Sequence, residues 1–179
     1  MIVKDRRLFL SYAIPCANTL MERGSITKEG IDELLNAIIN ERPIEDKDVD
    51  IFKVAKAHCT VIAKSLGKDV IDTEVIEEYF LRKHDEVVDE RYAQMGDFDP
   101  ETCRIFSGRV VSINSGFANV DTIRGNGRYR IDFTPKIKTN DYVIVHRDFV
   151  VRKSSKKEHD LLARAERNYF NRKKRNIIR

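Results

Sequence analysis

The sequence predicts an α+β protein in which an N-terminal helical bundle is followed by a small OB-like β-barrel and a C-terminal helix. Apolar residues recur at helical spacing through the first hundred residues. The spacing changes to strand-like alternation after residue 101, and the helical spacing returns after residue 154. We therefore expect three segments: an acidic helical bundle over residues 1–96, a barrel over 101–153 and a basic helix over 154–179.

Glycine and proline divide the helical pattern of the N-terminal segment. Pro15 interrupts the first predicted helix, and Gly24 and Gly67 follow helix-like stretches in the position where a helix commonly ends. Because the intervening connections are short, neighbouring helices should run antiparallel, as they do in a bundle. The predicted helices cover about residues 6–23, 25–43, 46–66 and 72–92.

The middle segment consists of short β-prone runs separated by Gly, Asn or Pro, which predicts a small closed barrel of four or five strands. Asn126-Gly127, within "RGNGR", predicts the turn of a hairpin. The run "YVIVHRDFVV", residues 142–151, is interpreted as one strand that would present His146 and Asp148 on the same face.

Charge is distributed unevenly along the chain. Residues 1–100 hold 14 Lys and Arg against 21 Asp and Glu, whereas residues 101–179 hold 19 against 8. The basic half either docks on the acidic half or binds an anionic partner, and RNA or single-stranded DNA is the partner that such a barrel and helix would suit. The predicted nucleic-acid contacts are Arg164, Arg167, Arg172, Lys173, Lys174 and Arg175.

The cysteines and histidines form no recognisable motif in the sequence. Cys16, Cys59 and Cys103 lie more than 40 residues apart, which argues against a disulfide framework and against a zinc knuckle. Cys59 is expected to be a packing residue, and His84, within "LRKHDE", is expected to face solvent. Because no Ser/His/Asp set or carboxylate pair stands out, we do not expect an enzyme.

Membrane association is not expected. No apolar run approaches the roughly 20 residues that a membrane-spanning helix needs. The short apolar stretch near the N-terminus continues into helix-like sequence, so it is interpreted as part of the mature protein. We therefore expect a cytoplasmic protein.

From residue 103 to about residue 162 the sequence resembles the HypC/HupF family of hydrogenase-formation chaperones. "CRIFSGRVVSI" is similar to the family's start motif, and "FANVDTIRGNGRYRIDF" to its alanine-x-valine-aspartate segment and the glycine turn that follows. "DYVIVHRDFVV" is similar to the strand that ends in the family's histidine. The order and spacing of these pieces carry the resemblance.

The resemblance implies a non-catalytic assembly factor for [NiFe]-hydrogenase maturation. By position the family's functional cysteine and histidine become Cys103 and His146. Cys103 would then hold an iron group transiently, with no intrinsic cofactor, and the partner would be a hydrogenase large-subunit precursor or a HypD-like maturation protein. A thiolate is a soft ligand for iron, an imidazole can accept its proton, and the Asp148 carboxylate could orient the ring.

The sequence also departs from the family pattern. In the family the cysteine stands at the extreme N-terminus, whereas here a hundred residues precede Cys103. Ser107 replaces a proline, and Asp148 replaces a glycine. A barrel that has kept the fold and lost the iron chemistry, or a nucleic-acid module, therefore remains open as an alternative.

Overall fold

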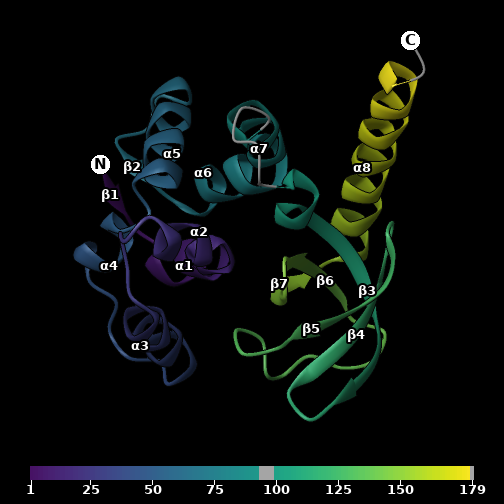
Figure 1. Cartoon of the computed structure of the whole chain (residues 1–179), viewed down its shortest axis with the longest axis horizontal. Helices are drawn as coiled ribbons and strands as arrows, with labels where there is room; N and C mark the ends of the chain where they lie inside the picture. The colour runs from purple at the N-terminus through teal and green to yellow at the C-terminus, as the bar shows by residue number, and fades with distance from the viewer. Residues whose placement is uncertain (93–98, 178–179) are drawn as a thin grey trace. The chain divides into compact units, whose positions relative to one another are not determined.

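The computed structural model describes the backbone of residues 1–92 and 99–177, and the side chains of residues 1–90 and 99–171 (Figure 1). The protein is α+β, with N-terminal helices, a closed β-barrel of five strands and a C-terminal helix, as the sequence predicts. The chain divides into two compact units, Met1–Arg104 and Ile105–Arg179. The predicted segment boundaries near residues 96, 101 and 153 stay predictions.

The N-terminal unit is helical, and its helices are shorter than the sequence pattern suggests. Pro15 lies in a 3₁₀ turn that separates α1 from α2, because proline cannot donate the hydrogen bond that a continuous helix would need. A π-helical segment likewise interrupts the last predicted helix. The helices are α1 (Arg6–Ala13), η1 (Ile14–Cys16), α2 (Ala17–Glu22), α3 (Lys28–Ile39), α4 (Asp46–Asp50), α5 (Lys53–Ser65), α6 (Thr73–Glu78), η2 (Tyr79–Lys83), α7 (His84–Tyr92) and η3 (Pro100–Cys103).

The core of this unit is aromatic where α1 meets the α6–η2 segment. The rings of Tyr12 and Phe80 stack with their centroids 4.9 Å apart, and Phe9 meets Phe80 edge-on at 5.9 Å. All three side chains are buried. A short parallel ladder joins β1 (Ile2–Val3) to β2 (Val70–Ile71), and strands this short leave no alternation that the sequence analysis could detect.

The C-terminal unit contains the barrel, whose strands follow the closed order β3-β4-β5-β7-β6 (Figure 1). Inward-facing valines from four strands, Val110, Val120, Val143 and Val150, lie at its centre. Gly108 is required by close packing, since a Cβ there would lie 2.8 Å from the Asp121 carbonyl oxygen. The strands are β3 (Ile105–Asn114), β4 (Phe117–Thr122), β5 (Gly125–Arg130), β6 (Tyr142–His146) and β7 (Phe149–Ser154).

The β4–β5 hairpin exists, but its predicted turn is wrong. Thr122 pairs with Gly125, so the connection consists of Ile123 and Arg124, whereas Gly127 lies within β5 opposite Val120. Gly125 takes φ 93°, a conformation that glycine adopts at little cost. The glycine that enables this turn is therefore Gly125, not Gly127.

The prediction of one continuous strand over residues 142–151 is also wrong. β6 ends at His146, β7 begins at Phe149, and Arg147 and Asp148 form the turn between them. Arg147 has φ 50°, which fits a tight two-residue hairpin connection. His146 is buried in the ladder and pairs with Phe149, whereas the side chain of Asp148 is exposed in the turn. The two residues therefore do not share a strand face.

Helix α8 (Lys156–Ile177) begins where the sequence predicts, because the Ser155 hydroxyl accepts a hydrogen bond from the backbone N–H of Glu158 at 3.1 Å. It packs on β3, where Glu166 accepts a hydrogen bond from the backbone of Ser107 and the ring of Phe170 stacks on Phe106. Within the described residues, no helix has the length and apolar character that crossing a membrane requires.

Candidate metal centre

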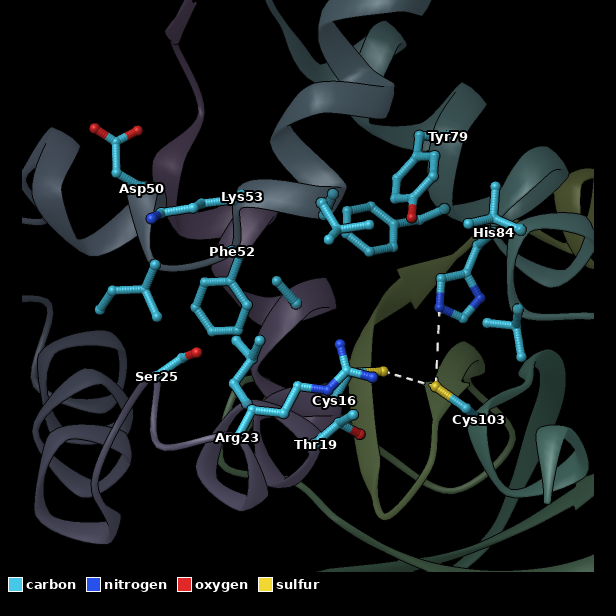
Figure 2. A pocket seen from close by; sticks show the side chains of 18 of the residues that line it. Cys16, Thr19, Arg23, Ser25, Asp50, Phe52, Lys53, Tyr79, His84 and Cys103 are labelled. Atoms are coloured by element: carbon cyan, nitrogen blue, oxygen red, sulfur yellow. Dashed lines mark hydrogen bonds between the residues drawn. The ribbon is translucent and has the colours of Figure 1, made fainter. Parts of the chain in front are cut away.

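Three potential metal ligands gather within the N-terminal unit. The Sγ atoms of Cys16 and Cys103 lie 2.7 Å apart, and the Cys103 Sγ lies 4.0 Å from the Nε2 atom of His84 (Figure 2). These three ligand atoms all lie within 4.8 Å of one another. Two thiols and an imidazole therefore occupy one small volume, although 87 residues separate the two cysteines along the chain.

Each cysteine stands at the end of a 3₁₀ turn. Cys16 is the last residue of η1, where Pro15 breaks the first helix, and Cys103 is the last residue of η3. The second turn starts at Asp99, whose carboxylate accepts a hydrogen bond from the Glu101 backbone at 2.9 Å. Cys103 is buried and Cys16 is partly exposed, so Cys16 is the ligand that solvent can reach.

His84 enters the cluster from the junction between the π-helical segment η2 and α7. The residue is 5% exposed, and its Nδ1 lies 3.0 Å from the carboxylate of Asp85. When a metal ion is bound, a carboxylate that accepts the Nδ1 proton makes the Nε2 lone pair available to the ion, as carboxylates behind metal-binding histidines do. π-Helical insertions frequently occur at functional sites, because they turn one side chain out of helical register.

The environment changes the proton affinity of His84. Burial by itself lowers the pKa of the imidazole, but hydrogen bonds and charge interactions with Asp85 and Cys103 outweigh it and raise the pKa to about 9. In the metal-free protein at neutral pH, the imidazole is therefore protonated and pairs with acidic neighbours. The Cys59 thiol provides a contrast within the same unit, since burial raises its pKa to about 12 and keeps it protonated.

Arg104 links the segment that carries Cys103 to the helix that carries His84 through hydrogen bonds and ion pairs. The arginine is 1% exposed, and its guanidinium donates to the backbone carbonyl of Asp85 at 2.9 Å and to the Glu101 carboxylate at 3.0 Å. It also donates to the Asp89 carboxylate, one turn further along α7. Since Arg104 follows Cys103 directly in the chain, these contacts set the position of the thiol relative to His84.

The cluster forms part of the wall of a cavity of about 620 Å³ within the N-terminal unit. This volume lies in the range of roughly 300–1,000 Å³ that small-molecule sites occupy. Figure 2 shows Cys16, Cys103 and His84 together on one side, and Ser25, Asp50 and Lys53 on the other. The wall is mostly apolar; its apolar and aromatic members are Ala13, Leu20, Ile51, Phe52, Val54, Ala55, Tyr79, Phe80, Val87 and Val88.

The donor set suits a soft or borderline transition-metal ion. Thiolate and imidazole ligands favour Zn²⁺, Cu⁺ and iron over the hard ions Mg²⁺ and Ca²⁺. Two thiolates on one tetrahedral zinc ion lie about 3.7 Å apart, as bond lengths of roughly 2.3 Å require. The 2.7 Å between Cys16 and Cys103 must therefore widen by about 1 Å on metal binding.

The structure places the predicted site residues in different surroundings. Cys103 belongs to the cluster, and its predicted partner His146 is buried in the barrel unit at the end of β6, so their pairing stays a prediction. Cys103 ends a 3₁₀ turn two residues before β3 and does not start the strand. Asp148 lies in the β6–β7 turn and so cannot orient His146 from the same strand face.

The predicted nucleic-acid residues all lie on α8. The side chains of Arg164 and Arg167 are exposed on this helix. The other four, Arg172, Lys173, Lys174 and Arg175, have side chains that lie outside the described part of the structure. On the barrel, the Arg128 guanidinium covers the Phe117 ring at 4.0 Å from its centroid, which occupies one ring face on which a base could stack.

Sequence reasoning missed two members of the cluster. His84 was expected to face solvent, which is wrong, because the π-helical segment turns it into the interior. Cys16 had only the neighbouring Pro15 to distinguish it, and a proline marks a helix break without indicating what lies beside it. Spacings of 68 and 19 residues between successive ligands match no short metal motif.

In comparisons with known proteins, no family model matches the sequence, and no curated protein matches it significantly. The resemblance to the HypC/HupF chaperones therefore stays a prediction. The fold and the site by themselves define an α+β protein with an OB-like barrel, whose helical unit contains a cluster of two cysteines and one histidine beside a cavity.

Proposed function

We propose that this chain is a non-catalytic assembly factor that binds a transition-metal ion, or an iron group, through Cys16, His84 and Cys103 and passes it to a client protein. The observation that carries the proposal is the convergence of two sulfurs and one imidazole nitrogen within 4.8 Å of one another. The Cys59 thiol, by contrast, is fully buried in α5, and burial raises its pKa to about 12. Two thiols beside an imidazole and a carboxylate are instead the arrangement of a metal site.

Transient binding is supported by the exposure of one ligand. Cys16 is partly exposed, so a client ligand can approach the metal from that side. This exposure supports delivery of a metal rather than its permanent storage.

The resemblance of residues 103–162 to the HypC/HupF family suggests that the chain acts in the maturation of a hydrogenase. The matched cysteine is Cys103, which is also a member of the cluster. The donor set fits an iron group, because thiolate is a soft ligand for iron. We therefore propose a hydrogenase large-subunit precursor or a HypD-like maturation protein as the partner, with His146 as the predicted second contact of Cys103 on the barrel.

Anaerobic titration of the metal-free full-length chain with Co²⁺ tests the metal site, since thiolate-to-cobalt charge transfer reports on sulfur ligation. We expect about one equivalent to bind, and Cys16→Ser, Cys103→Ser and His84→Gln each to weaken binding at least about tenfold. Cys59→Ser is the matched control and should bind like the wild type. Equal binding by all four variants would overturn the proposed site. His146→Gln, measured alongside, tests the predicted Cys103–His146 pair.

The client is tested by an anaerobic pull-down that compares the wild type with Cys103→Ala. We expect the wild type to retain a metalloenzyme precursor or a maturation protein, and the variant to lose most of it. Recovery of RNA with both proteins, and its loss after Arg164 and Arg167 are changed to Gln, would replace this proposal with the nucleic-acid alternative. Arg109→Gln, an exposed arginine on β3, is the control for charge removal.

A further inference from the structure

We propose that Cys16 and Cys103 form a reversible disulfide bond when the metal-free chain reacts with a small-molecule disulfide such as oxidised glutathione, and that this bond closes the metal site. The bond itself rests on the arrangement of the two thiols. Its regulatory consequence rests on the proposed function, because it concerns the ligands of the proposed metal site. Three observations carry the inference: the distance between the sulfurs, their places in the fold and the difference in their exposure.

The two sulfurs already lie near bonding distance. Their Sγ atoms are 2.7 Å apart, so they must approach by roughly 0.65 Å to reach the roughly 2.05 Å of a disulfide bond. Both cysteines are free thiols, and both belong to the N-terminal unit. Each stands at the end of a 3₁₀ turn, η1 or η3. The bond therefore requires small side-chain rotations at two turns rather than a movement of packed helices.

The difference in exposure sets the order of the reaction. Cys16 is partly exposed and Cys103 is buried, so a disulfide from solvent meets Cys16 first. The Cys16 thiolate attacks one sulfur of oxidised glutathione, forms a mixed disulfide and releases one glutathione thiolate. Cys103, as a thiolate, then attacks the Cys16 sulfur and releases the second glutathione. Two protein thiols are thus oxidised, one glutathione disulfide is reduced, and the two thiol protons end on the two glutathione molecules.

The cavity gives the mixed disulfide the space that it needs. Cys16 and Cys103 both line this cavity of about 620 Å³, and Figure 2 shows their sulfurs next to each other on one side of it. A volume in this range accommodates a small molecule. The glutathione group on Cys16 can therefore occupy the cavity while Cys103 displaces it.

The disulfide bond and a bound metal ion exclude each other. A metal ion binds cysteine as the thiolate, and the sulfurs of a disulfide are no longer thiolates. Forming the bond therefore removes both sulfur ligands of the proposed site, so a chain that is oxidised cannot hold the metal. Conversely, a metal ion that binds only the reduced form protects the two cysteines from oxidation. The thiol–disulfide balance of the surroundings thus decides whether the chain accepts a metal.

The test equilibrates the reduced, metal-free full-length chain anaerobically with glutathione buffers of increasing oxidised fraction. Remaining thiols are alkylated as the chain is unfolded, and the masses of the chain and of its peptides are measured. We expect a monomer that lacks two hydrogen atoms, with the Cys16 and Cys103 peptides joined and Cys59 alkylated. Reduced glutathione should reverse the bond. Full alkylation of Cys16 and Cys103 in the most oxidising buffer, or links only to Cys59 or to another chain, would overturn the proposal.

Serine variants test the order of the two steps. Cys103→Ser should accumulate the mixed disulfide of Cys16 with glutathione, because no second thiol displaces it. Cys16→Ser should acquire at least about tenfold less glutathione, because Cys103 is buried. Cys59→Ser is the matched control and should form the Cys16–Cys103 bond like the wild type. Equal glutathione attachment to Cys16→Ser and Cys103→Ser would overturn the assignment of Cys16 as the first thiol to react.

A Co²⁺ titration of the oxidised chain tests the regulatory consequence. We expect the oxidised chain to show no sulfur-to-cobalt charge-transfer band, and saturating Zn²⁺ to slow disulfide formation in the reduced chain at least about tenfold. If the oxidised chain still shows the band, closure of the metal site by the bond is overturned.

The two titrations separate this inference from the proposed function. If the reduced chain binds Co²⁺ through sulfur but forms no Cys16–Cys103 bond, this inference fails and the proposed function stands. If the bond forms but the reduced chain shows no sulfur-to-cobalt band, the proposed function fails and the disulfide stands without its regulatory role.

Discussion

The sulfur atoms of Cys16 and Cys103 lie 2.7 Å apart in the N-terminal unit, at the ends of two 3₁₀ turns that belong to opposite ends of that unit's sequence. This distance lies between the roughly 2.05 Å of a disulfide bond and the separation of about 3.7 Å at a shared tetrahedral ion. The pair can therefore reach either arrangement through a small movement of its side chains, and the reactivity of the thiols reports which one forms.

Thiol labelling should separate the three cysteines. In the native metal-free protein kept under reducing conditions and then desalted anaerobically, we expect Cys16 to react first with an Ellman-type reagent, since it is partly exposed. Cys59 should stay unreactive until the protein unfolds, because it is fully buried and its raised pKa of about 12 leaves almost no thiolate. Mass spectrometry of the labelled peptides identifies the sites. Bound Zn²⁺ should protect Cys16 and Cys103, and rapid native labelling of Cys59 would contradict this order.

Asp85 should strengthen the metal site without touching the metal. Its carboxylate lies 3.0 Å from the Nδ1 of His84, so Asp85→Asn removes the charge that raises the basicity of the imidazole. We expect Co²⁺ affinity to fall about tenfold, with the sulfur charge-transfer band unchanged at saturation. Glu86→Gln, at the next and exposed position, is the control. A loss of the band at saturation would indicate a damaged site and contradict a positioning role.

Arg104 should contribute to the stability of the N-terminal unit through its buried ion pairs. Arg104→Met fits the side-chain volume but leaves Asp89 and Glu101 without the cation that they contact. We expect the free energy of unfolding in urea to fall by roughly 3 kcal/mol, because removing one partner of a buried pair is costly. Arg109→Met, at an exposed position, should change it by less than about 0.5 kcal/mol. A similar fall in the free energy of unfolding in both variants would contradict a stabilising role of the Arg104 ion pairs.

Asp72 should stabilise the start of α6 in a manner that depends on pH. Its carboxylate accepts a hydrogen bond from the Val75 backbone at 3.1 Å, and the hydrogen bond from Lys68 holds the pKa of Asp72 below its usual value of 3.8. Asp72→Ala should cost about 1 kcal/mol at pH 7, as the loss of a helix cap does.

The sign of the pH dependence follows from the lowered pKa of Asp72. The carboxylate stabilises the fold above pH 3.8 and loses this contribution as the pH falls through the lower folded value. Urea unfolding at several pH values should therefore show the cost of Asp72→Ala shrinking below pH 3.8. Asp72→Asn keeps a capping oxygen and should cost less at pH 7. A cost that does not depend on pH would contradict the contribution of the charge.

The fold class follows from the sequence because hydrophobic spacing is a local property. Alternation after residue 101 and helical spacing before it correctly predict a barrel preceded by helices. The turns were harder to place, since Gly125 and Gly127 are both plausible turn residues and only the register of β4 with β5 decides between them. The hairpin turn at Arg147 and Asp148 contains neither glycine nor asparagine, and a single aspartate is too weak a turn signal to divide an apolar run.

By itself the sequence determined the order of helices and strands and the basic C-terminal helix. It also identified Cys103 as a candidate metal ligand. The tertiary structure alone decided that Cys16 and His84 join Cys103, because a proline break, a π-helical segment and the buried Arg104 bring together residues that no local pattern relates. Secondary structure reflects side chains a few positions apart, and hydrophobic spacing records it. A set of metal ligands from three distant segments depends on tertiary packing, and tertiary packing produces no periodic pattern in the amino-acid sequence.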